Sequence, residues 1–270
     1  NTLRKEVDRL NIVVCVKVVP KVDQVKFDPA TKTVDRTSAE NELNEADKNA
    51  LETALQLKEK HGGKVAVVSM GPPFFEPFLK ICVAMGADDA VLLSDKAFAG
   101  ADTYATSYVL AQAVKKLKPD LVLCGESTSD SGTAQVPAQM AEWLGYPNIS
   151  YASNVSVDNG FVVARRTVKG GYEVVKAPLP AVVSVELGSN TPRFPDFRRK
   201  RWAEREFKTT VWTSADLELD LSLAGRAGSK TDVVELQSIA PPQRLRKFLE
   251  GSEDEIAQTI LEIIKEAVTE

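Results

Sequence analysis

The sequence predicts an α/β protein with a doubly wound, mostly parallel sheet, a β-hairpin insertion and a C-terminal arm. Up to Gly145, short apolar runs alternate with helical patterns, and repeated strand–helix units of this length are typical of parallel sheets with right-handed crossovers. Farther on, Asn-Gly and Gly-Gly pairs separate short alternating runs, which indicates hairpins. We therefore expect an α/β domain over residues 1–188, with the hairpin region at 151–177, and an arm over 189–270.

The elements before Gly145 follow from apolar patterns and from stop signals. The Val-rich run 12–19 predicts a strand that is covered on both faces, because it shows no polar alternation. Helical spacing of apolar residues predicts a helix over 44–60, which ends before Gly62. The same signals predict the remaining elements of this half in order: strand 64–70, helix 74–85, strand 90–93, helix 103–117, strand 120–124 and helix 134–144.

The second half of the chain is less regular. Alternating runs predict short strands at 151–157, 161–168 and 172–176, and the apolar run 181–187 predicts a strand that returns to the main sheet. Residues 189–226 are polar and show no convincing core period. Ser252 and Glu255 then form a capping box before an apolar helical stripe, which predicts a helix over 252–268. We expect this arm to wrap around a partner, because it cannot form a core of its own.

Composition argues against several classes of protein. The net charge is −4, so no global positive field attracts nucleic acid. No apolar run approaches the roughly 20 residues of a membrane helix, and the polar start of the chain does not resemble a secretory signal. Three separated cysteines and a single histidine favour a reducing compartment and disfavour a metal site. We therefore expect a cytoplasmic protein without a metal, without nucleic acid and without direct membrane insertion.

Two polar loops at the ends of predicted strands are the best candidates for a phosphate site, because ligands of open α/β sheets bind beyond the carboxyl ends of the strands. The loop 125–136 runs into a helix, and its N–H groups with the hydroxyls of Ser131 and Thr133 would cradle a phosphate. The loop 99–106 repeats the pattern, with Asp102 and Thr103 as helix caps. Two such loops suggest a diphosphate, but both also fit ordinary capped helix starts, and the residues alone leave this alternative open.

Other familiar patterns are missing from the sequence. There is no GxGxxG after the first strand, no GxxxxGK[ST] and no GxSxG, and one histidine cannot serve a hydrolase triad. The sequence therefore favours binding over bond-making. The basic run Arg198–Trp202 fits either an RNA backbone or an acidic protein surface, and the negative net charge favours the protein partner.

The order of several short motifs resembles the beta subunits of electron-transfer flavoproteins, also called the FixA family. Each motif alone is weak, but their joint order and spacing over about residues 11–244 are highly specific. The sequence departs from the family at Asn44-Glu45-Ala46, where the family commonly has Asn-Pro-Phe. The resemblance therefore leaves the contact with the adenine undetermined at these residues. The resemblance is carried by 14–17, 43–47 with Leu51-Glu52, 68–72, 84–88, 125–144, Arg166 before Gly170-Gly171, 179–183 and 191–195.

The resemblance implies a fold of the adenine-nucleotide-binding type and a set of nucleotide contacts. It also implies a recognition arm at 191–202 that docks onto redox partners, with Phe197 as its apolar anchor and Arg193, Phe194 and Arg198 beside it. Thr103 and Thr106 would contact the flavin or the diphosphate, and Arg166 would place a charge near the flavin. The cofactor-binding residues expected are Cys15, Lys17, Asn44, Asp47, Ser69, Met70, Gly71, Asp102, Thr103, Thr106, Glu126, Asp130, Gly132, Thr133, Ala134, Gln135, Val136 and Arg166.

Beta subunits of this family divide by ligand. Conventional ones hold AMP as a structural filler, whereas bifurcating ones hold FAD, which accepts hydride from NADH and splits the electron pair. Segments 100–107 and 132–136 are similar to the bifurcating group, which implies FAD, an alpha subunit, and partners of the dehydrogenase, quinone-reductase or ferredoxin type. The chain would then be no catalyst alone. The alternative is a docking subunit with AMP, and a more distant one is a stand-alone adenine-nucleotide sensor, which leaves the arm without a purpose.

Overall fold

The structure, a computed structural model, describes residues 9–21, 26–28, 33–35, 40–232, 234 and 248–269. Residues 1–234 form one compact unit and residues 235–270 form a second, and each is described by itself. The predicted division of roles at residue 188 stays a prediction.

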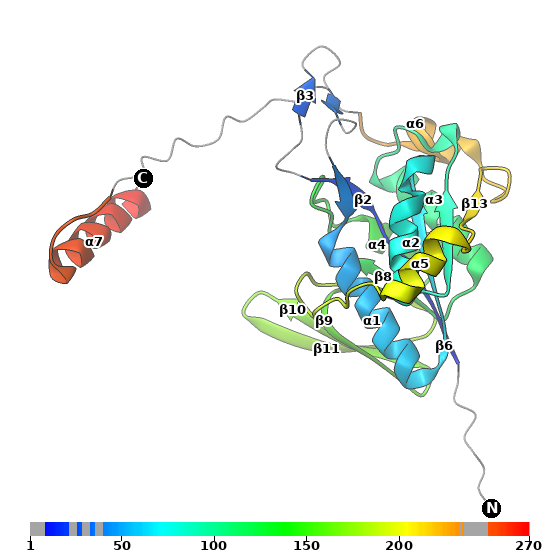
Figure 1. Cartoon of the computed structure of the whole chain (residues 1–270), viewed down its shortest axis with the longest axis horizontal. Helices are drawn as coiled ribbons and strands as arrows, with labels where there is room; N and C mark the ends of the chain where they lie inside the picture. The colour runs from blue at the N-terminus through cyan, green and yellow to red at the C-terminus, as the bar shows by residue number, and fades with distance from the viewer. Residues whose placement is uncertain are drawn as a thin grey trace, which may run out of the picture. The chain divides into compact units, whose positions relative to one another are not determined.

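A nine-stranded, mostly parallel sheet is the centre of the first unit (Figure 1). The predicted fold class is thereby confirmed. β10 pairs antiparallel with both β9 and β11, and all other neighbouring strands of the sheet pair parallel. The strands lie in the order β11 (Gly171–Pro178), β10 (Phe161–Val168), β9 (Asn148–Asp158), β12 (Ala181–Val185), β8 (Leu121–Gly125), β1 (Leu10–Cys15), β6 (Gly63–Met70), β7 (Asp89–Leu93) and β13 (Thr210–Trp212).

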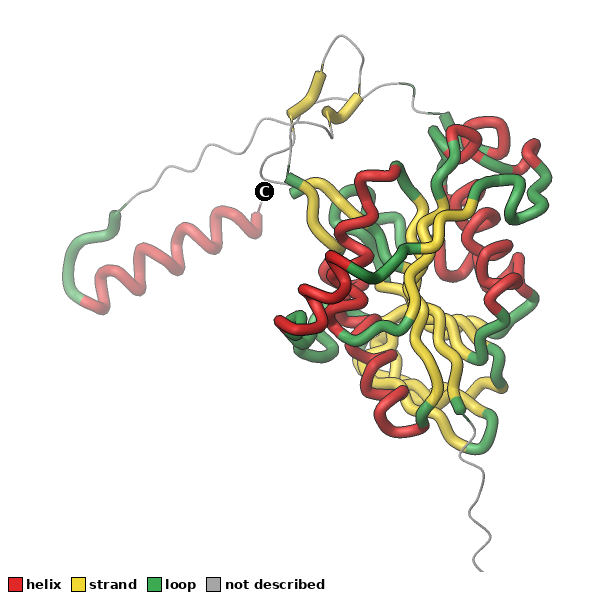
Figure 2. Tube along the Cα trace, turned by 45° about the vertical axis from the view of Figure 1, so that its right-hand side comes forward, coloured by secondary structure: helices red, strands yellow, loops and turns green. Residues whose placement is uncertain are grey.

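Helices cover both faces of this sheet (Figure 2). On one face, Ile12 and Val14 of β1 belong to the same buried cluster as residues of α1 (Glu45–His61), α2 (Glu76–Met85) and α5 (Phe197–Arg205). On the other face, Val13 and Cys15 share a cluster with residues of α3 (Thr103–Leu117) and α4 (Val136–Leu144). Because both sets of alternating side chains are buried, β1 is Val-rich rather than alternating, as the sequence predicted.

Two predicted elements, the strand 12–19 and the helix 134–144, have different bounds in the structure. The run 12–19 is two strands, because β1 ends at Cys15 and the separate strand β2 (Val18–Pro20) pairs with β5 (Asn41–Leu43). A second small pair is β3 (Lys26–Asp28) with β4 (Thr33–Asp35). The predicted helix over 134–144 begins later, at Val136, because Ala134 has a φ of 54° and stands outside helical geometry.

The segment 189–226, where no regular element is predicted from the sequence, contains several. Helix α5 packs against α2, and β13 extends the sheet beside β7. Ala203 is the one buried residue of α5, so this helix has no apolar stripe from which to predict it. The short elements η4 (Leu221–Leu223) and α6 (Gly225–Gly228) follow, and η2 (Pro73–Phe75) and η3 (Lys96–Phe98) lie earlier in the chain.

The hairpins and the last helix agree with the sequence. Strands β9, β10 and β11 form a meander, and Asn159 and Gly160, with φ angles of 49° and 78°, make its first turn. Strand β12 returns to the main sheet between β9 and β8. In the second unit, α7 (Glu253–Thr269) begins with the predicted capping box, in which the N–H of Ser252 donates to Glu255 Oε2 at 2.8 Å. Among the described residues, no helix is long and apolar enough to cross a membrane.

Candidate nucleotide-binding site and docking arm

The carboxyl ends of β1 and β8 form the topological switch point of the sheet. From β1 the strand order runs outward through β6 and β7 on one side and through β8 and β12 on the other. Ligands of open α/β sheets bind at such a point. The loop 125–136, which the sequence singled out, starts at the end of β8, so the structure brings it to this position.

Two residues at the start of α1 hold that loop in place. Asn44, which precedes α1, donates to the carbonyl of Ser127 at 2.8 Å and accepts from the N–H of Ser129 at 3.2 Å. Asp47 accepts from the N–H of Lys17 at 2.8 Å and from the N–H of Gly125 at 3.0 Å. Both carboxylate oxygens of Asp47 are therefore engaged within the protein. Asn44 and Asp47 thus position the loop, and their contact with a ligand stays a prediction.

Burial makes the carboxyl group of Asp47 a weaker acid than usual. Desolvation raises its pKa to about 7, and it outweighs the hydrogen bonds from Lys17, Asn44 and Gly125, which act in the opposite direction. Gly125 lies so close to α1 that a Cβ atom there would stand 2.8 Å from Ala46 and in contact with Asp47. The end of β8 is thus packed tightly against the start of α1.

The loop itself has the backbone of an anion nest. Gly132 and Ala134 have φ angles of 61° and 54°, and the N–H of Gly132 donates back to the carbonyl of Thr128 at 2.8 Å. Within the described part of the chain, the N–H groups of Thr133, Ala134 and Gln135 have no acceptor. Lys17 Nζ donates to both carboxylate oxygens of Asp130 in the same loop, at 2.7 and 2.8 Å, so the charge of this ammonium is already paired. N–H groups without an acceptor among the described residues, just before a helix start, are suited to bind a phosphate.

The second predicted loop meets the first at one point. Thr103 Oγ1 donates to Gln135 Oε1 at 3.2 Å, so the start of α3 lies beside the start of α4. Asp102, however, caps α3 through the N–H of Ala105 and accepts from the N–H groups of Lys230 and Thr231 at 2.7 and 3.0 Å. Its carboxylate therefore fastens residues 230–231 to α3. Thr106 lies one turn into that helix, with its N–H on the Asp102 carbonyl.

The predicted contact residues at the end of β6, and Cys15 at the end of β1, are buried or half-buried. Ser69 is buried and its hydroxyl has no partner among the described residues, while Met70 packs against the core beside β1. Gly71 lies under the ring of Phe75, and its N–H donates to Leu93. Cys15 stands beside Cys124 across the β1–β8 pair, and the hydrogen bond between them, together with burial, raises the pKa of Cys124 well above its ordinary value. The side chain of Cys15 thus belongs to the core.

Glu126, at the start of the loop 125–136, and Arg166 make no hydrogen bond to residues 130–136 among the contacts of the described residues. Glu126 Oε1 accepts from the N–H of Leu187 at 3.3 Å. Arg166 lies on β10, and the register passes from it through Ala152 and Val185 to Gly125, which is three strands away. Its Nε is buried and has no partner among the described residues, and its Nη1 is 3.8 Å from Glu173. Of the described residues, no cluster of three or more His, Cys, Asp or Glu could hold a metal ion.

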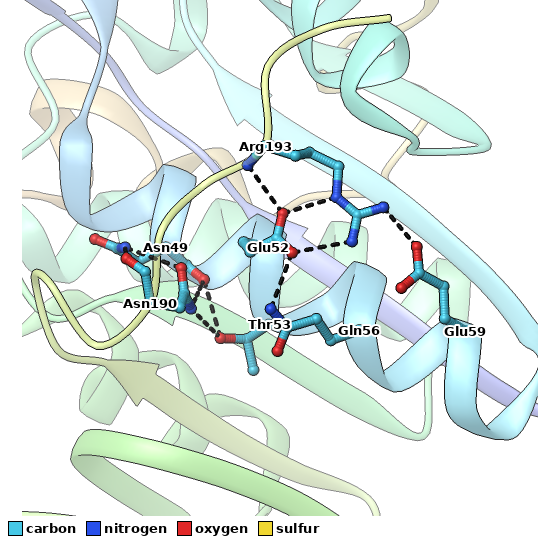
Figure 3. Close-up of polar contacts among 7 residues, drawn as sticks. All are labelled: Asn49, Glu52, Thr53, Gln56, Glu59, Asn190 and Arg193. Atoms are coloured by element: carbon cyan, nitrogen blue, oxygen red, sulfur yellow. Dashed lines mark hydrogen bonds and ion pairs between the residues drawn. The ribbon is translucent and has the colours of Figure 1, made fainter.

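The predicted docking arm divides into exposed and engaged residues. Phe194 and Phe197 are 93% and 79% exposed, and Arg198 is exposed as well. Arg193 instead points onto α1 (Figure 3), where it pairs with Glu52 and Glu59 at 2.8 and 2.5 Å. The sequence placed Arg193 with the docking residues and did not single out its acidic partners. A signal was present, because Asn49, Glu52, Thr53 and Gln56 form a polar face at helical spacing beside the apolar positions of α1.

The chain is similar to known proteins over most of its length. The model of the electron transfer flavoprotein domain matches residues 31–217. The electron transfer flavoprotein subunit beta of Thermoanaerobacterium thermosaccharolyticum is 39% identical over 94% of this chain and 97% of its own length. Subunit CarD of the caffeyl-CoA reductase-Etf complex of Acetobacterium woodii is 39% identical, over 87% of this chain and 89% of its own. Protein FixA of Azotobacter vinelandii is 36% identical, over 91% and 90%.

Proposed function

The chain belongs to the family of electron transfer flavoprotein beta subunits and FixA proteins, and from this premise we propose that it binds FAD at the β1–β8 edge. With an alpha subunit, it would carry electrons from NADH or a dehydrogenase to further acceptors by flavin-based electron bifurcation. Its role as an electron-transfer subunit comes with the family. The cofactor, the bifurcation and a cytoplasmic location are the proposal.

The observation that carries the cofactor proposal is the nest at 132–135. Its N–H groups, which have no acceptor among the described residues, favour negatively charged phosphate oxygens, and the ion pair of Lys17 with Asp130 lies at the same loop. Thr103, which bonds to Gln135, brings a second hydroxyl to the site. We propose that Asn44, Asp47 and Gly125 fix the shape of this loop, while Thr133 to Val136 contact the phosphates.

The bifurcation proposal rests on likeness to relatives. CarD, a subunit of a caffeyl-CoA reductase-Etf complex, is 39% identical to this chain over 87% of the chain's length. When bound, FAD supplies the acceptor for hydride and the carrier for single electrons. The chain's own residues would bind the diphosphate, orient the flavin and present the arm 191–202 to redox partners. Arg166, with its unpaired Nε, is the proposed source of positive charge on the hairpin side.

A second candidate is a conventional beta subunit with AMP. The same nest accepts the single phosphate of AMP, since no described contact requires a second one. In this case the FAD of the complex belongs to the alpha subunit, and this chain serves as a docking scaffold.

The flavin-to-heterodimer ratio tests the proposal. The chain is co-expressed with its alpha subunit, the visible absorbance is measured, and the nucleotides are extracted and identified by chromatography. We expect two FAD per heterodimer. One FAD and one AMP would overturn the FAD proposal and support the scaffold, and a complex without any adenine nucleotide beyond the alpha subunit's FAD would overturn both.

A further inference from the structure

The first part of the docking arm lies along α1 in a dense polar network (Figure 3). The N–H of Gly188 donates to Asn49 Oδ1 at 3.1 Å, and the amide of Asn190 exchanges hydrogen bonds with Asn49 and reaches Thr53 Oγ1 at 2.9 Å. Arg193 closes the network. Its Nε and Nη2 donate to the two carboxylate oxygens of Glu52 at 2.8 and 2.9 Å, and its backbone N–H donates to Glu52 at 3.1 Å.

This contact has the character of a structural attachment. The side chain of Glu52 is 6% exposed, and a two-pronged guanidinium–carboxylate pair is among the stronger and more directional hydrogen-bonded pairs. Burial alone would raise the pKa of Glu52, but the hydrogen bonds from Arg193 and Gln56 outweigh it and hold the pKa below its ordinary value. Glu52 is therefore ionised at neutral pH and keeps its partner. Glu59, which is exposed, adds a second carboxylate to the same guanidinium.

The arm is attached a second time, to the C-terminal end of α2. The N–H of Asp196 donates to the carbonyl of Ala84 at 3.1 Å. Arg199 Nε and Nη2 each donate at 2.5 Å, to the carbonyls of Val83 and Ala87. Carbonyl groups at a helix end lack intrahelical partners and carry partial negative charge, so a guanidinium satisfies both needs.

The exposed aromatic residues lie between these two attachments. Phe194 follows Arg193 directly, and Phe197 stands two residues before Arg199. A loop that is already ordered loses less conformational entropy when a partner binds. The two attachments thus keep the segment with Phe194 and Phe197 ordered before a partner binds.

We propose that Arg193 and Arg199 are positioning residues, which hold Phe194 and Phe197 in place for a redox partner and do not themselves touch it. This inference rests on the proposed docking function of the arm. Arg193 acts through Glu52 of α1, and Arg199 acts through the carbonyls of α2. Arg198, whose side chain is exposed beside them, is the arginine that contacts the partner.

Amide hydrogen exchange of the intact heterodimer tests the attachment without any partner. In Arg193→Gln and in Glu52→Gln, the amides of Gly188 and Arg193 should exchange about tenfold faster, because one charge-assisted pair is lost. In Arg199→Gln, the amide of Asp196 should do the same. Arg198→Gln is the matched control and should leave all three rates unchanged. If Arg193→Gln does not fold, Glu52→Gln alone carries this test, and unchanged protection in Glu52→Gln overturns the proposal.

Kinetics with the dehydrogenase that reduces the heterodimer distinguish positioning from direct contact. We expect Arg193→Gln and Glu52→Gln each to raise the KM for the dehydrogenase severalfold at unchanged kcat, and the double variant to match the single ones. Arg198→Gln should add its own effect to that of Glu52→Gln. A raised KM in Arg193→Gln with an unaffected Glu52→Gln would show direct contact and overturn the proposal, as would unchanged KM in both. If no dehydrogenase reacts, the docking function fails, while the exchange result still stands for the attachment.

Discussion

Helix α1 supports two regions of the molecule by different means. At its start, Asn44 and Asp47 hold the candidate cradle through buried hydrogen bonds to the loop that follows β8. Farther along, Glu52 and Glu59 hold the docking arm through ion pairs with Arg193, whose side chain is 33% exposed. The first region depends on the protonation and volume of buried groups, whereas the second depends on the pairing of charges. One helix thus links the proposed cofactor site to the proposed docking surface.

The largest difference between the two regions should appear in the pH dependence of stability. Burial raises the pKa of Asp47 from 3.8 to about 7, so between these values the folded protein holds a proton that the unfolded chain has released. The free energy of unfolding therefore falls as pH rises through this window, by up to about 1.4 kcal/mol per pH unit. Urea denaturation from pH 4 to pH 8 measures this slope.

Two variants test whether Asp47 is the group that causes this slope. Asp47→Asn should flatten the dependence, whereas Glu45→Gln, at the exposed start of the same helix, should keep it. A slope that survives in Asp47→Asn would place the titrating group elsewhere. The pH dependence that Glu52 contributes has the opposite sign, because its pKa is lowered in the folded protein. Its contribution to stability is therefore lost only as pH falls through the acidic range.

The next largest effect should be the loss of stability when a side chain is added at Gly125. In Gly125→Ala the new methyl group would meet Ala46 and Asp47, and we expect a loss of stability of about 1–3 kcal/mol from this overpacking. Gly171→Ala is the control, because a Cβ there has open space around it. Chemical denaturation compares the two variants, and equal stability of both would contradict the tight packing of β8 against α1.

Nucleotide affinity should depend on the loop 125–136 and not on the second unit. The double variant Thr133→Val with Gln135→Ala removes the hydroxyl and amide groups at the nest, and affinity should fall about tenfold because hydrogen bonds to charged phosphates are lost. Nucleotide retained after dialysis, determined by chromatography, is the measurement. The pair Thr259→Val with Gln258→Ala, on α7, makes the same chemical changes in the second unit and should retain full occupancy. Full occupancy in the first variant would remove the loop from the site.

The smallest effect belongs to the arm. Phe197→Ala should raise the KM for a dehydrogenase partner about fivefold, as expected for an exposed aromatic anchor, and should leave thermal stability unchanged. Phe248→Ala removes another exposed phenylalanine, in the second unit, and should change neither quantity. Equal kinetics of the two variants would contradict the role of Phe197.

Much of the fold could be predicted because local patterns and the final packing agree. The runs in β1, β6, β8 and β12 are apolar since helices cover both faces, and Asn159-Gly160 fits its turn by backbone geometry. Helix α5 could not be predicted, because its attachment comes from Arg199 and Asp196 rather than from an apolar stripe. Polar attachments between distant segments leave no period in the sequence.

The candidate site shows the same limit. Loop 125–136 was predicted because hydroxyl and glycine residues before a helix are a local signal. The pairing of Asp102 with residues 230–231, and of Arg193 with Glu52, joins positions more than a hundred residues apart. Nothing local distinguishes a carboxylate that will hold a chain segment from one that will face a ligand. The cap that Asp102 makes on α3 was therefore predicted, whereas its bonds to residues 230–231 and the pairing of Arg193 with Glu52 were not.

A crystal structure of the heterodimer with its native nucleotides would test the central claim most directly. The account predicts a diphosphate with oxygens about 2.7–3.2 Å from the N–H groups of Thr133, Ala134 and Gln135, and a flavin beyond it. A nucleotide bound elsewhere on this chain, or an alpha-subunit side chain in the nest in place of a phosphate, would contradict it.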